Sequence, residues 1–319
     1  MPGTIIEINK LTKLYNGYRA VNELTLSIEE GEIFGLLGPN GAGKTTTILM
    51  LMGLTEPSSG TVRIAGYDST RETLQVKRIV GYLPDQVGFY ENRTALENLV
   101  FTARLNGITE EEARKAADEL LDTVGLTEVK NKKVGTFSRG MRQRLGLADV
   151  LIKNPKIIIL DEPTIGIDPK GVSDFLGLIK SLSRERGITV LLSSHLLNQV
   201  QKICDRVGIF IKGNLKAVGK IEELAGELLK EGNIEIRIAV KEELNEKIME
   251  KVKALSGITE INSRKREMFI KAKEDLSSPI AKILIDSGFS LLHLSTKEYS
   301  LEDIYDFYFG GGAADGKAG

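Results

Sequence analysis

The stretch that decides the fold of this chain is Ile33-Phe34-Gly35-Leu36-Leu37-Gly38-Pro39-Asn40-Gly41-Ala42-Gly43-Lys44-Thr45-Thr46-Thr47-Ile48-Leu49-Met50. Its apolar beginning predicts a buried strand, its glycine-rich middle predicts a loop, and the residues from Lys44 predict a helix. In such a loop, glycines let successive backbone N–H groups converge on phosphate oxygens, and the positive end of the helix adds to the attraction. The stretch therefore predicts a phosphate-binding loop at the edge of an α/β sheet.

The side chains at the end of this loop predict a nucleotide and a cation. The expected phosphate-binding residues are Gly38, Pro39, Asn40, Gly41, Ala42, Gly43, Lys44, Thr45 and Thr46. Lys44 would bridge the β- and γ-phosphates, and the Thr45 hydroxyl would hold Mg²⁺. An ordinary glycine-rich turn is the competing interpretation, and the strand before the loop and the helix after it disfavour it.

A second apolar strand, Ile157 to Leu160, ends in the carboxylates Asp161 and Glu162. Open α/β sheets bind ligands at the carboxyl ends of their strands, so these acids are expected in the nucleotide site. Asp161 suits Mg²⁺, and Glu162 would orient and deprotonate the attacking water. A polar strand end that only caps the next turn is the alternative for a single acid, and it loses support once the phosphate loop is accepted.

Composition and length limit the class of protein. The chain has 319 residues, of which 41% are hydrophobic and 27% charged, which is typical of a globular protein. Length alone suggests about two domains. Apolar runs are far shorter than the roughly 18 residues that cross a bilayer, and no secretory signal is recognisable. A cytoplasmic location is expected, with the lone Cys204 acting as a small hydrophobe. A net charge of −1 does not favour nucleic acid as a partner.

Apolar spacing divides the remaining chain into a helical insertion and a separate C-terminal part. Helical patterns begin near Thr94, Glu110 and Ser138, within a helical subdomain expected at about 87–153. After residue 220 the order becomes strand, helix, strand, strand, helix, strand, with a Lys/Glu-rich helix over about 241–255. This order matches the ferredoxin-like split arrangement and predicts a small α+β domain at 221–309. The alternative is that these strands extend the main sheet. The glycine-rich end, 310–319, is expected to be a loose tail.

Four further motifs, in this order along 1–220, make the chain resemble an ATP-binding subunit of the ABC transporters. Gly81-Tyr82-Leu83-Pro84-Asp85-Gln86 resembles the glutamine loop, and Phe137-Ser138-Arg139-Gly140-Met141 occupies the place of the family signature Leu-Ser-Gly-Gly-Gln. Ile167-Asp168-Pro169 resembles the loop after the catalytic glutamate, and Ser193-Ser194-His195 resembles the switch histidine. The resemblance implies a P-loop NTPase fold with a RecA-like core and antiparallel β and helical subdomains. It also implies ATP and Mg²⁺ as cofactors.

The resemblance assigns roles to residues that the phosphate loop alone does not reach. Gln86 would act on the metal, His195 would act in catalysis, and Asp168 would belong to a dimer loop. Tyr15 resembles the aromatic residue that stacks on adenine in this family. The alternative is a half-buried tyrosine at a strand end with only a structural role. Arg139 and Met141 depart from the signature, whereas Ser138 and Gly140 are retained, so the helix that follows can still attract a γ-phosphate.

In the family, two chains pair head to tail, and each ATP lies between one chain's phosphate loop and the other chain's signature. Because this chain has one set of motifs, it needs a second ATPase subunit, and a homodimer is the simpler expectation. A separately encoded membrane permease is the other implied partner, with the chain peripheral on the inner face of the cell membrane. The sequence of Gly81–Thr94 and the short C-terminal domain that ends in Leu301-Glu302-Asp303-Ile304-Tyr305 resemble the type-2 exporter branch. An importer ATPase, or a non-transport ABC ATPase acting on nucleic acid or the ribosome, remain the alternatives.

Overall fold

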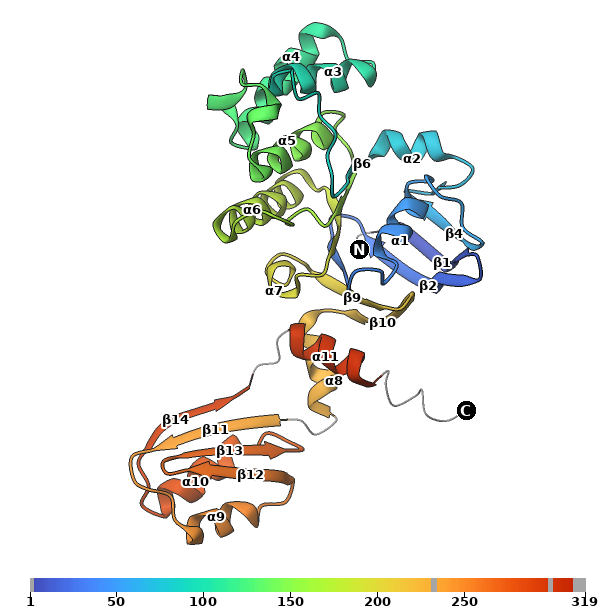
Figure 1. Cartoon of the computed structure of the whole chain (residues 1–319). Helices are drawn as coiled ribbons and strands as arrows, with labels where there is room; N and C mark the ends of the chain where they lie inside the picture. The colour runs from blue at the N-terminus through green and yellow to red at the C-terminus, as the bar shows by residue number, and fades with distance from the viewer. Residues whose placement is uncertain (1–2, 231–233, 298–300, 312–319) are drawn as a thin grey trace. The chain divides into compact units, whose positions relative to one another are not determined.

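The chain folds as two compact units, Met1–Gly219 and Lys220–Gly319, in a computed structural model that describes residues 3–230, 234–297 and 301–311. Figure 1 shows the helices and strands of each unit. Within the described ranges, no helix is both long and apolar enough to cross a bilayer.

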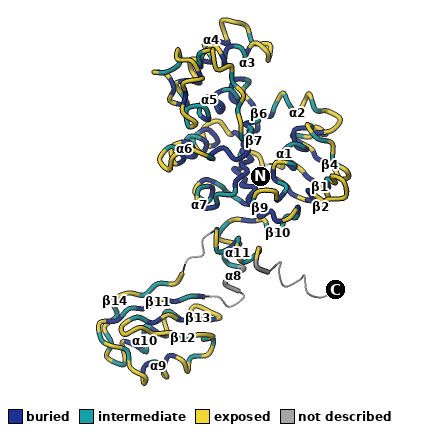
Figure 2. The backbone as a smooth tube through the Cα atoms, viewed as in Figure 1, coloured by how far each residue is buried: buried dark blue, intermediate teal, exposed yellow. Residues whose placement is uncertain are grey.

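The first unit is built on a six-stranded sheet whose central strands are parallel. The strand order is β10 (Asn214–Gly219), β9 (Arg206–Ile211), β3 (Ile33–Leu37), β8 (Thr189–Ser194), β7 (Ile157–Asp161) and β6 (Val80–Leu83), with only β10 antiparallel to its neighbour. Strands β3, β7 and β8 are buried along their whole length, as expected for strands covered on both faces. Figure 2 shows the burial of β7. The carboxyl ends of β3, β7 and β8 consequently meet at one edge.

A second, antiparallel sheet and helix α1 complete the core of this unit. The sheet has the order β2 (Tyr18–Glu29), β1 (Thr4–Tyr15), β4 (Ser59–Ile64) and β5 (Tyr67–Asp68). Apolar side chains of this sheet share one hydrophobic core with Phe34 and Ile159 of the parallel sheet and with Ile48 of α1 (Lys44–Leu51). Helices α2 (Thr73–Ile79), α6 (Pro169–Arg186) and α7 (Leu197–Val200) belong to the same unit. The predicted α/β fold with an antiparallel β part is confirmed.

The helices expected between residues 94 and 150 begin where their capping residues indicated. Thr94 and Thr109 accept hydrogen bonds from the N–H groups of Glu97 and Glu112 in capping boxes, and Ser138 accepts from Met141. The helices are α3 (Ala95–Leu105), α4 (Glu110–Thr123) and α5 (Arg139–Leu151), with short 3₁₀ turns η1 (Thr127–Val129) and η2 (Val134–Thr136). Local capping therefore places the start of α5 directly at the signature.

The second unit holds a four-stranded antiparallel sheet of its own. Its order is β12 (Ile258–Arg264), β13 (Glu267–Ala272), β11 (Ile234–Val240) and β14 (Leu291–Thr296), which is the ferredoxin-like order. Helices α9 (Glu246–Lys253) and α10 (Ser277–Asp286) cover one face, where Ile248, Val252, Ile280 and Leu284 join the core. The alternative in which these strands extend the main sheet is wrong. Helices α8 (Ile221–Lys230) and α11 (Leu301–Gly311) pack on each other.

Two expected boundaries in this unit differ from the structure. The helix expected over 241–255 begins at Glu246, because the Asn245 side chain accepts from the Ile248 N–H at 3.0 Å and caps it there. The loose tail expected over 310–319 is wrong at its first positions, because residues 310 and 311 belong to α11. The rest of the expected tail lies outside the described residues.

Candidate functional site

The loop between β3 and α1 takes a conformation that requires glycine. Gly43, which directly precedes α1, has φ +109°, and Gly41 has φ +79°. A Cβ atom on Gly43 would lie 2.3 Å from the backbone oxygen of Ala20, so a larger residue has no room there. Because Gly41 and Gly43 carry no side chain, the backbone at the start of α1 can approach an anion closely.

Lys44 is the first residue of α1, directly after this loop, and is buried. Its Nζ atom donates to the backbone oxygens of Gly38 at 2.7 Å and Pro39 at 3.2 Å. The same Nζ atom lies 3.1 Å from Oε1 of Glu162, and the two side chains are 5% and 9% exposed. The predicted cation of the phosphate loop and the predicted catalytic carboxylate are thus in direct contact.

One serine of the neighbouring strand holds the carboxylate of Asp161 and the backbone of Glu162 at the end of β7. Ser193 pairs with Asp161 in the sheet register, and its Oγ donates to Oδ1 of Asp161 at 2.5 Å. The same Oγ accepts from the backbone N–H of Glu162 at 3.1 Å. Sequence analysis gave Ser193 no role, although its place directly after a buried apolar run was the available signal. Ser193 fixes the relative orientation of Asp161 and Glu162.

Glu162 also contacts the predicted switch histidine. Nδ1 of His195 lies 2.9 Å from Oε2 of Glu162, and the backbone N–H of His195 donates to the same oxygen at 3.3 Å. Glu162 itself has φ +49°, a strained value for a residue with a side chain, of the kind found at functional sites. The carboxylate is therefore held on one side by Lys44 and on the other by His195.

These residues line a pocket of about 340 Å³ at the carboxyl edge of the sheet. Its lining is Asn40, Gly41, Gly43, Lys44, Thr45, Thr46, Asp85, Asp161, Glu162 and Ile165. Most of the predicted phosphate-binding positions, together with Asp161 and Glu162, therefore meet in one cavity. A cavity of this size that is lined by a lysine, a glycine-rich loop and two carboxylates can hold the phosphates of a nucleotide.

The donors in this pocket fit Mg²⁺. Mg²⁺ keeps several waters and is usually bound by one or two protein oxygens together with substrate phosphates. The Thr45 hydroxyl and the Asp161 carboxylate are two such oxygens in the same pocket. Among the residues that the structure describes, no group of three or more His, Cys, Asp or Glu could ligate a metal. The site thus suits a cation that is bound jointly with phosphate.

The other predicted site residues lie outside this pocket. Gln86 lines a neighbouring cavity of about 390 Å³ with Arg139 and Arg142. Tyr15 is 44% exposed at the end of β1, with the Lys13 ammonium 5.0 Å from its ring centroid. Ser138 and Gly140 lie at the start of α5. Asp168 caps α6, where its Oδ1 accepts from the Gly171 N–H at 2.9 Å.

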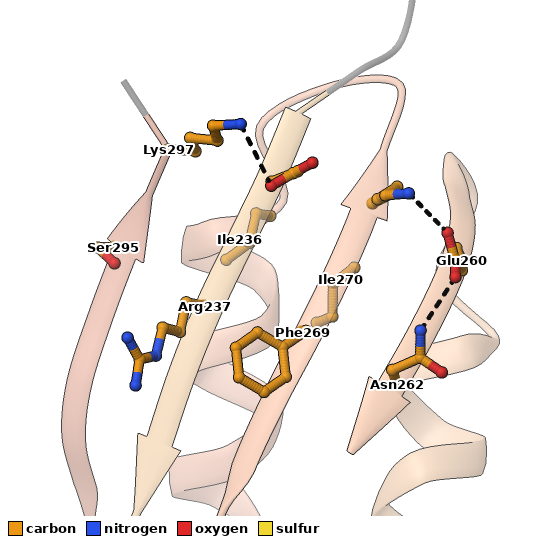
Figure 3. Close-up of a pocket in the computed structure, with 10 residues that line it drawn as sticks. Ile236, Arg237, Glu260, Asn262, Phe269, Ile270, Ser295 and Lys297 are labelled. Carbon is orange, nitrogen blue, oxygen red and sulfur yellow. Dashed lines mark hydrogen bonds and ion pairs between the residues drawn. The ribbon is translucent and has the colours of Figure 1, made fainter. Parts of the chain in front are cut away.

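The second unit carries a pocket of about 340 Å³ on the sheet face away from α9 and α10, where Phe269 is 37% exposed (Figure 3). The Arg237 guanidinium lies 5.6 Å from the Phe269 ring centroid. The ion pairs on this face are Arg237–Glu267 at 2.8 Å, Lys271–Glu260 at 2.9 Å and Lys297–Glu235 at 3.8 Å. Each of the three cations that line the pocket, Arg237, Lys271 and Lys297, therefore has a carboxylate beside it.

Comparison with known proteins agrees with the geometry. Residues 21–165 match the family model described as ABC transporter. The bacitracin transport ATP-binding protein BcrA of Bacillus licheniformis is 37% identical over 97% of this chain and 98% of that protein. The linearmycin resistance ATP-binding protein LnrL of Bacillus subtilis (strain 168) is 34% identical over 94% of this chain and 97% of that protein.

A solved structure extends the comparison to three dimensions. The dimeric, post-hydrolysis ATP-binding cassette MJ0796 bound to ADP and Pi superposes with a TM-score of 0.62 and 28% identity, covering 68% of this chain and 99% of that one. The family model, the near full-length relatives and this fold agree with the phosphate loop and the carboxylates found here. The chain belongs to the ATP-binding subunits of the ABC transporters and is an ATPase of that family.

Proposed function

We propose that this chain hydrolyses ATP to drive export of a compound through a separately encoded membrane permease. The relatives named for bacitracin transport and linearmycin resistance match nearly the whole chain, including the C-terminal unit, and support the exporter assignment over an importer. Those names also suggest an antibiotic-like compound as the cargo. The chain would then work on the inner face of the membrane, where ATP is available.

In the proposed site, different residues bind the phosphates, the Mg²⁺ ion and the attacking water. Lys44 and the backbone N–H groups of the loop bind the β- and γ-phosphates, while Thr45 and Asp161 hold Mg²⁺, which neutralises developing charge on the phosphates. Glu162 accepts a proton from the attacking water, and His195 keeps its carboxylate oriented. The contacts of Glu162 with both Lys44 and His195 are the observation that carries this proposal.

A complete site needs a second copy of the chain. Ser138, Gly140 and Asp168 do not line the described pocket around Lys44, although all three belong to the motifs of the family. We propose that they reach the ATP of the second subunit, as the dimeric form of the similar cassette MJ0796 suggests. Gln86 would act on the metal, and Tyr15 would stack on adenine.

Transport by membrane vesicles tests this proposal. Inside-out vesicles that contain the partner permease should accumulate bacitracin or a related compound when ATP and the parent chain are added. The Glu162→Gln variant should support no accumulation at equal occupancy of the permease. Accumulation with Glu162→Gln would contradict the assigned reaction. A neighbouring gene for a solute-binding protein would instead favour an importer.

A further inference from the structure

The residue that departs from the family signature, Arg139, forms an ion pair with Asp85. Arg139 Nη2 lies 3.3 Å from Oδ1 of Asp85. Arg139 begins helix α5, and Asp85 follows β6 directly before Gln86. The pair therefore joins two motifs that are 54 residues apart in the chain.

Asp85 lies between two cavities. It lines the nucleotide pocket together with Lys44 and Glu162, and it also lines the neighbouring cavity with Arg139 and Gln86. Burial raises the pKa of the neighbouring Tyr82 to about 12, and the carboxylates of Asp161 and Asp85 add to this rise. One carboxylate thus contacts the arginine of the signature and faces the pocket in which the phosphates would lie.

Arg139 also fits tightly against the segment that follows Glu162. A Cβ atom on Gly166 would lie 2.7 Å from Cδ and 2.8 Å from Nε of Arg139, so a larger residue there would displace the arginine side chain. At the next residue, a Cβ atom on Gly140 would lie 3.5 Å from Cγ2 of Ile167. The start of α5 is therefore packed against the segment between the proposed base, Glu162, and the proposed dimer residue, Asp168.

We propose that the Asp85–Arg139 pair is a positioning device that transmits the state of one chain's nucleotide pocket to the signature it offers to the second subunit. The proposal rests on the proposed function, because it requires the signature to act on the other subunit's ATP. In a family member with glycine in place of Arg139, this pair cannot form. The arginine is therefore a functional replacement at the signature, and Asp85 is its partner.

The exposure of the pair separates this role from a purely structural one. The two side chains are 46% and 45% exposed, and ion pairs of this kind add little to stability. Removing either charge should therefore leave the melting temperature within about 2 °C of the parent value. If these substitutions lower turnover without lowering the melting temperature, the ion pair positions the signature rather than stabilising the fold.

A double-mutant cycle in the full chain is the first test. Asp85→Asn and Arg139→Gln should each lower kcat by about tenfold while changing KM for ATP by less than about threefold. The kcat of the double variant should be no lower than that of the less active single variant, since both substitutions break the same interaction. Asp118→Asn and Lys130→Gln, which break a similarly exposed pair of 2.7 Å in the helical subdomain, should leave kcat unchanged. Independent, multiplicative losses for Asp85 and Arg139 would overturn the proposal, as would unchanged kcat.

Mixing of subunits then shows which ATP site the Asp85 substitution damages. Consider a mixed dimer of one Asp85→Asn subunit and one Lys44→Ala subunit. If the Asp85 substitution acts through Arg139, it damages the signature that its own subunit offers to the phosphate loop of the Lys44→Ala subunit, and that site is already inactive. The other site combines an intact phosphate loop with an intact signature. Adding the inactive Lys44→Ala protein should therefore raise the activity per Asp85→Asn subunit several-fold. If Asp85 acts only on its own pocket, both sites are damaged and no rise occurs, which would contradict the proposal. Ser138→Arg mixed with Lys44→Ala tests shared sites alone, so failure of that control would count against the proposed dimer, and the double-mutant cycle would still decide the ion pair.

Discussion

Lys44 and Glu162 lie beyond the carboxyl ends of two different strands and form a buried ion pair, with Nζ of the lysine 3.1 Å from Oε1 of the glutamate. The lysine begins α1 after β3, and the glutamate follows β7. Each is also held by a second group, the loop carbonyls for Lys44 and His195 for Glu162. A γ-phosphate that binds Lys44 would compete with Glu162 for the ammonium, so nucleotide binding is expected to release the carboxylate for its work on water.

Ser193→Ala should impair both stability and use of the cation. The substitution removes the hydroxyl that donates to Asp161 and accepts from the Glu162 N–H, which should lower the free energy of unfolding by about 1–3 kcal/mol. Asp161 would then be less well oriented, so ATPase activity should fall by about tenfold and half-maximal activity should need more Mg²⁺. Titration of activity with Mg²⁺ checks this.

Ser194→Ala is the matched control. Its Oγ accepts from the Leu196 N–H at 2.9 Å and contacts neither carboxylate among the interactions described. This variant should lose some stability and keep the Mg²⁺ dependence of the parent. Equal Mg²⁺ dependence in Ser193→Ala and Ser194→Ala would contradict the role given to Ser193.

Gly43→Ala should be far more damaging than Gly41→Ala. Both glycines have positive φ, which costs an L-residue about 1–2 kcal/mol. At position 43 the new methyl group would also meet the Ala20 oxygen at 2.3 Å and the Phe210 ring at 2.7 Å, whereas nothing lies within 4 Å at position 41. Urea unfolding followed by a probe in the first unit should give a loss of about 2–4 kcal/mol for Gly43→Ala. Equal losses would mean that the packing at Gly43 is not as described.

The first unit should fold and bind nucleotide without the second. A chain that ends at Gly219 retains every residue that lines the nucleotide pocket. Its melting temperature should rise with Mg-ATP by as much as that of the full chain, because ligand stabilisation depends on the site alone. Thermal melts of both proteins, with and without Mg-ATP, provide the comparison. An unfolded truncated chain, or one without a shift, would show that the C-terminal unit is part of the binding fold.

Local patterns predicted much of this structure. The apolar run before Gly38 and the helix from Lys44 reflect burial and spacing within a few residues of sequence, and Thr94 and Ser138 cap their helices through bonds to residues three positions on. The succession of strands and helices after residue 233 was predicted from their apolar patterns, and its match to the ferredoxin-like arrangement predicted how the strands pair. These features depend on neighbours in the chain.

The features that sequence did not reveal depend on distant contacts. The role of Ser193 needs β8 beside β7, and the Asp85–Arg139 pair needs the start of α5 beside the end of β6. From the signature alone, Arg139 suggested only added positive charge, because its acidic partner lies in another motif. The start of α9 is an exception with a local cause, because the cap that Asn245 forms with Ile248 ends the influence of the helix-favouring residues before it.

The Glu162→Gln variant tests the central claim, that Glu162 activates water in a site whose nucleotide is held by Lys44. Because Gln keeps the size of the side chain but cannot accept the proton, ATP binding should remain within about threefold of the parent while turnover falls by about 10²–10⁴. Lys44→Ala, in contrast, should lose Mg-ATP binding. Both quantities are measured in the same preparation, by equilibrium binding of ATP and by phosphate release. Turnover by Glu162→Gln within tenfold of the parent, or tight Mg-ATP binding by Lys44→Ala, would contradict the account.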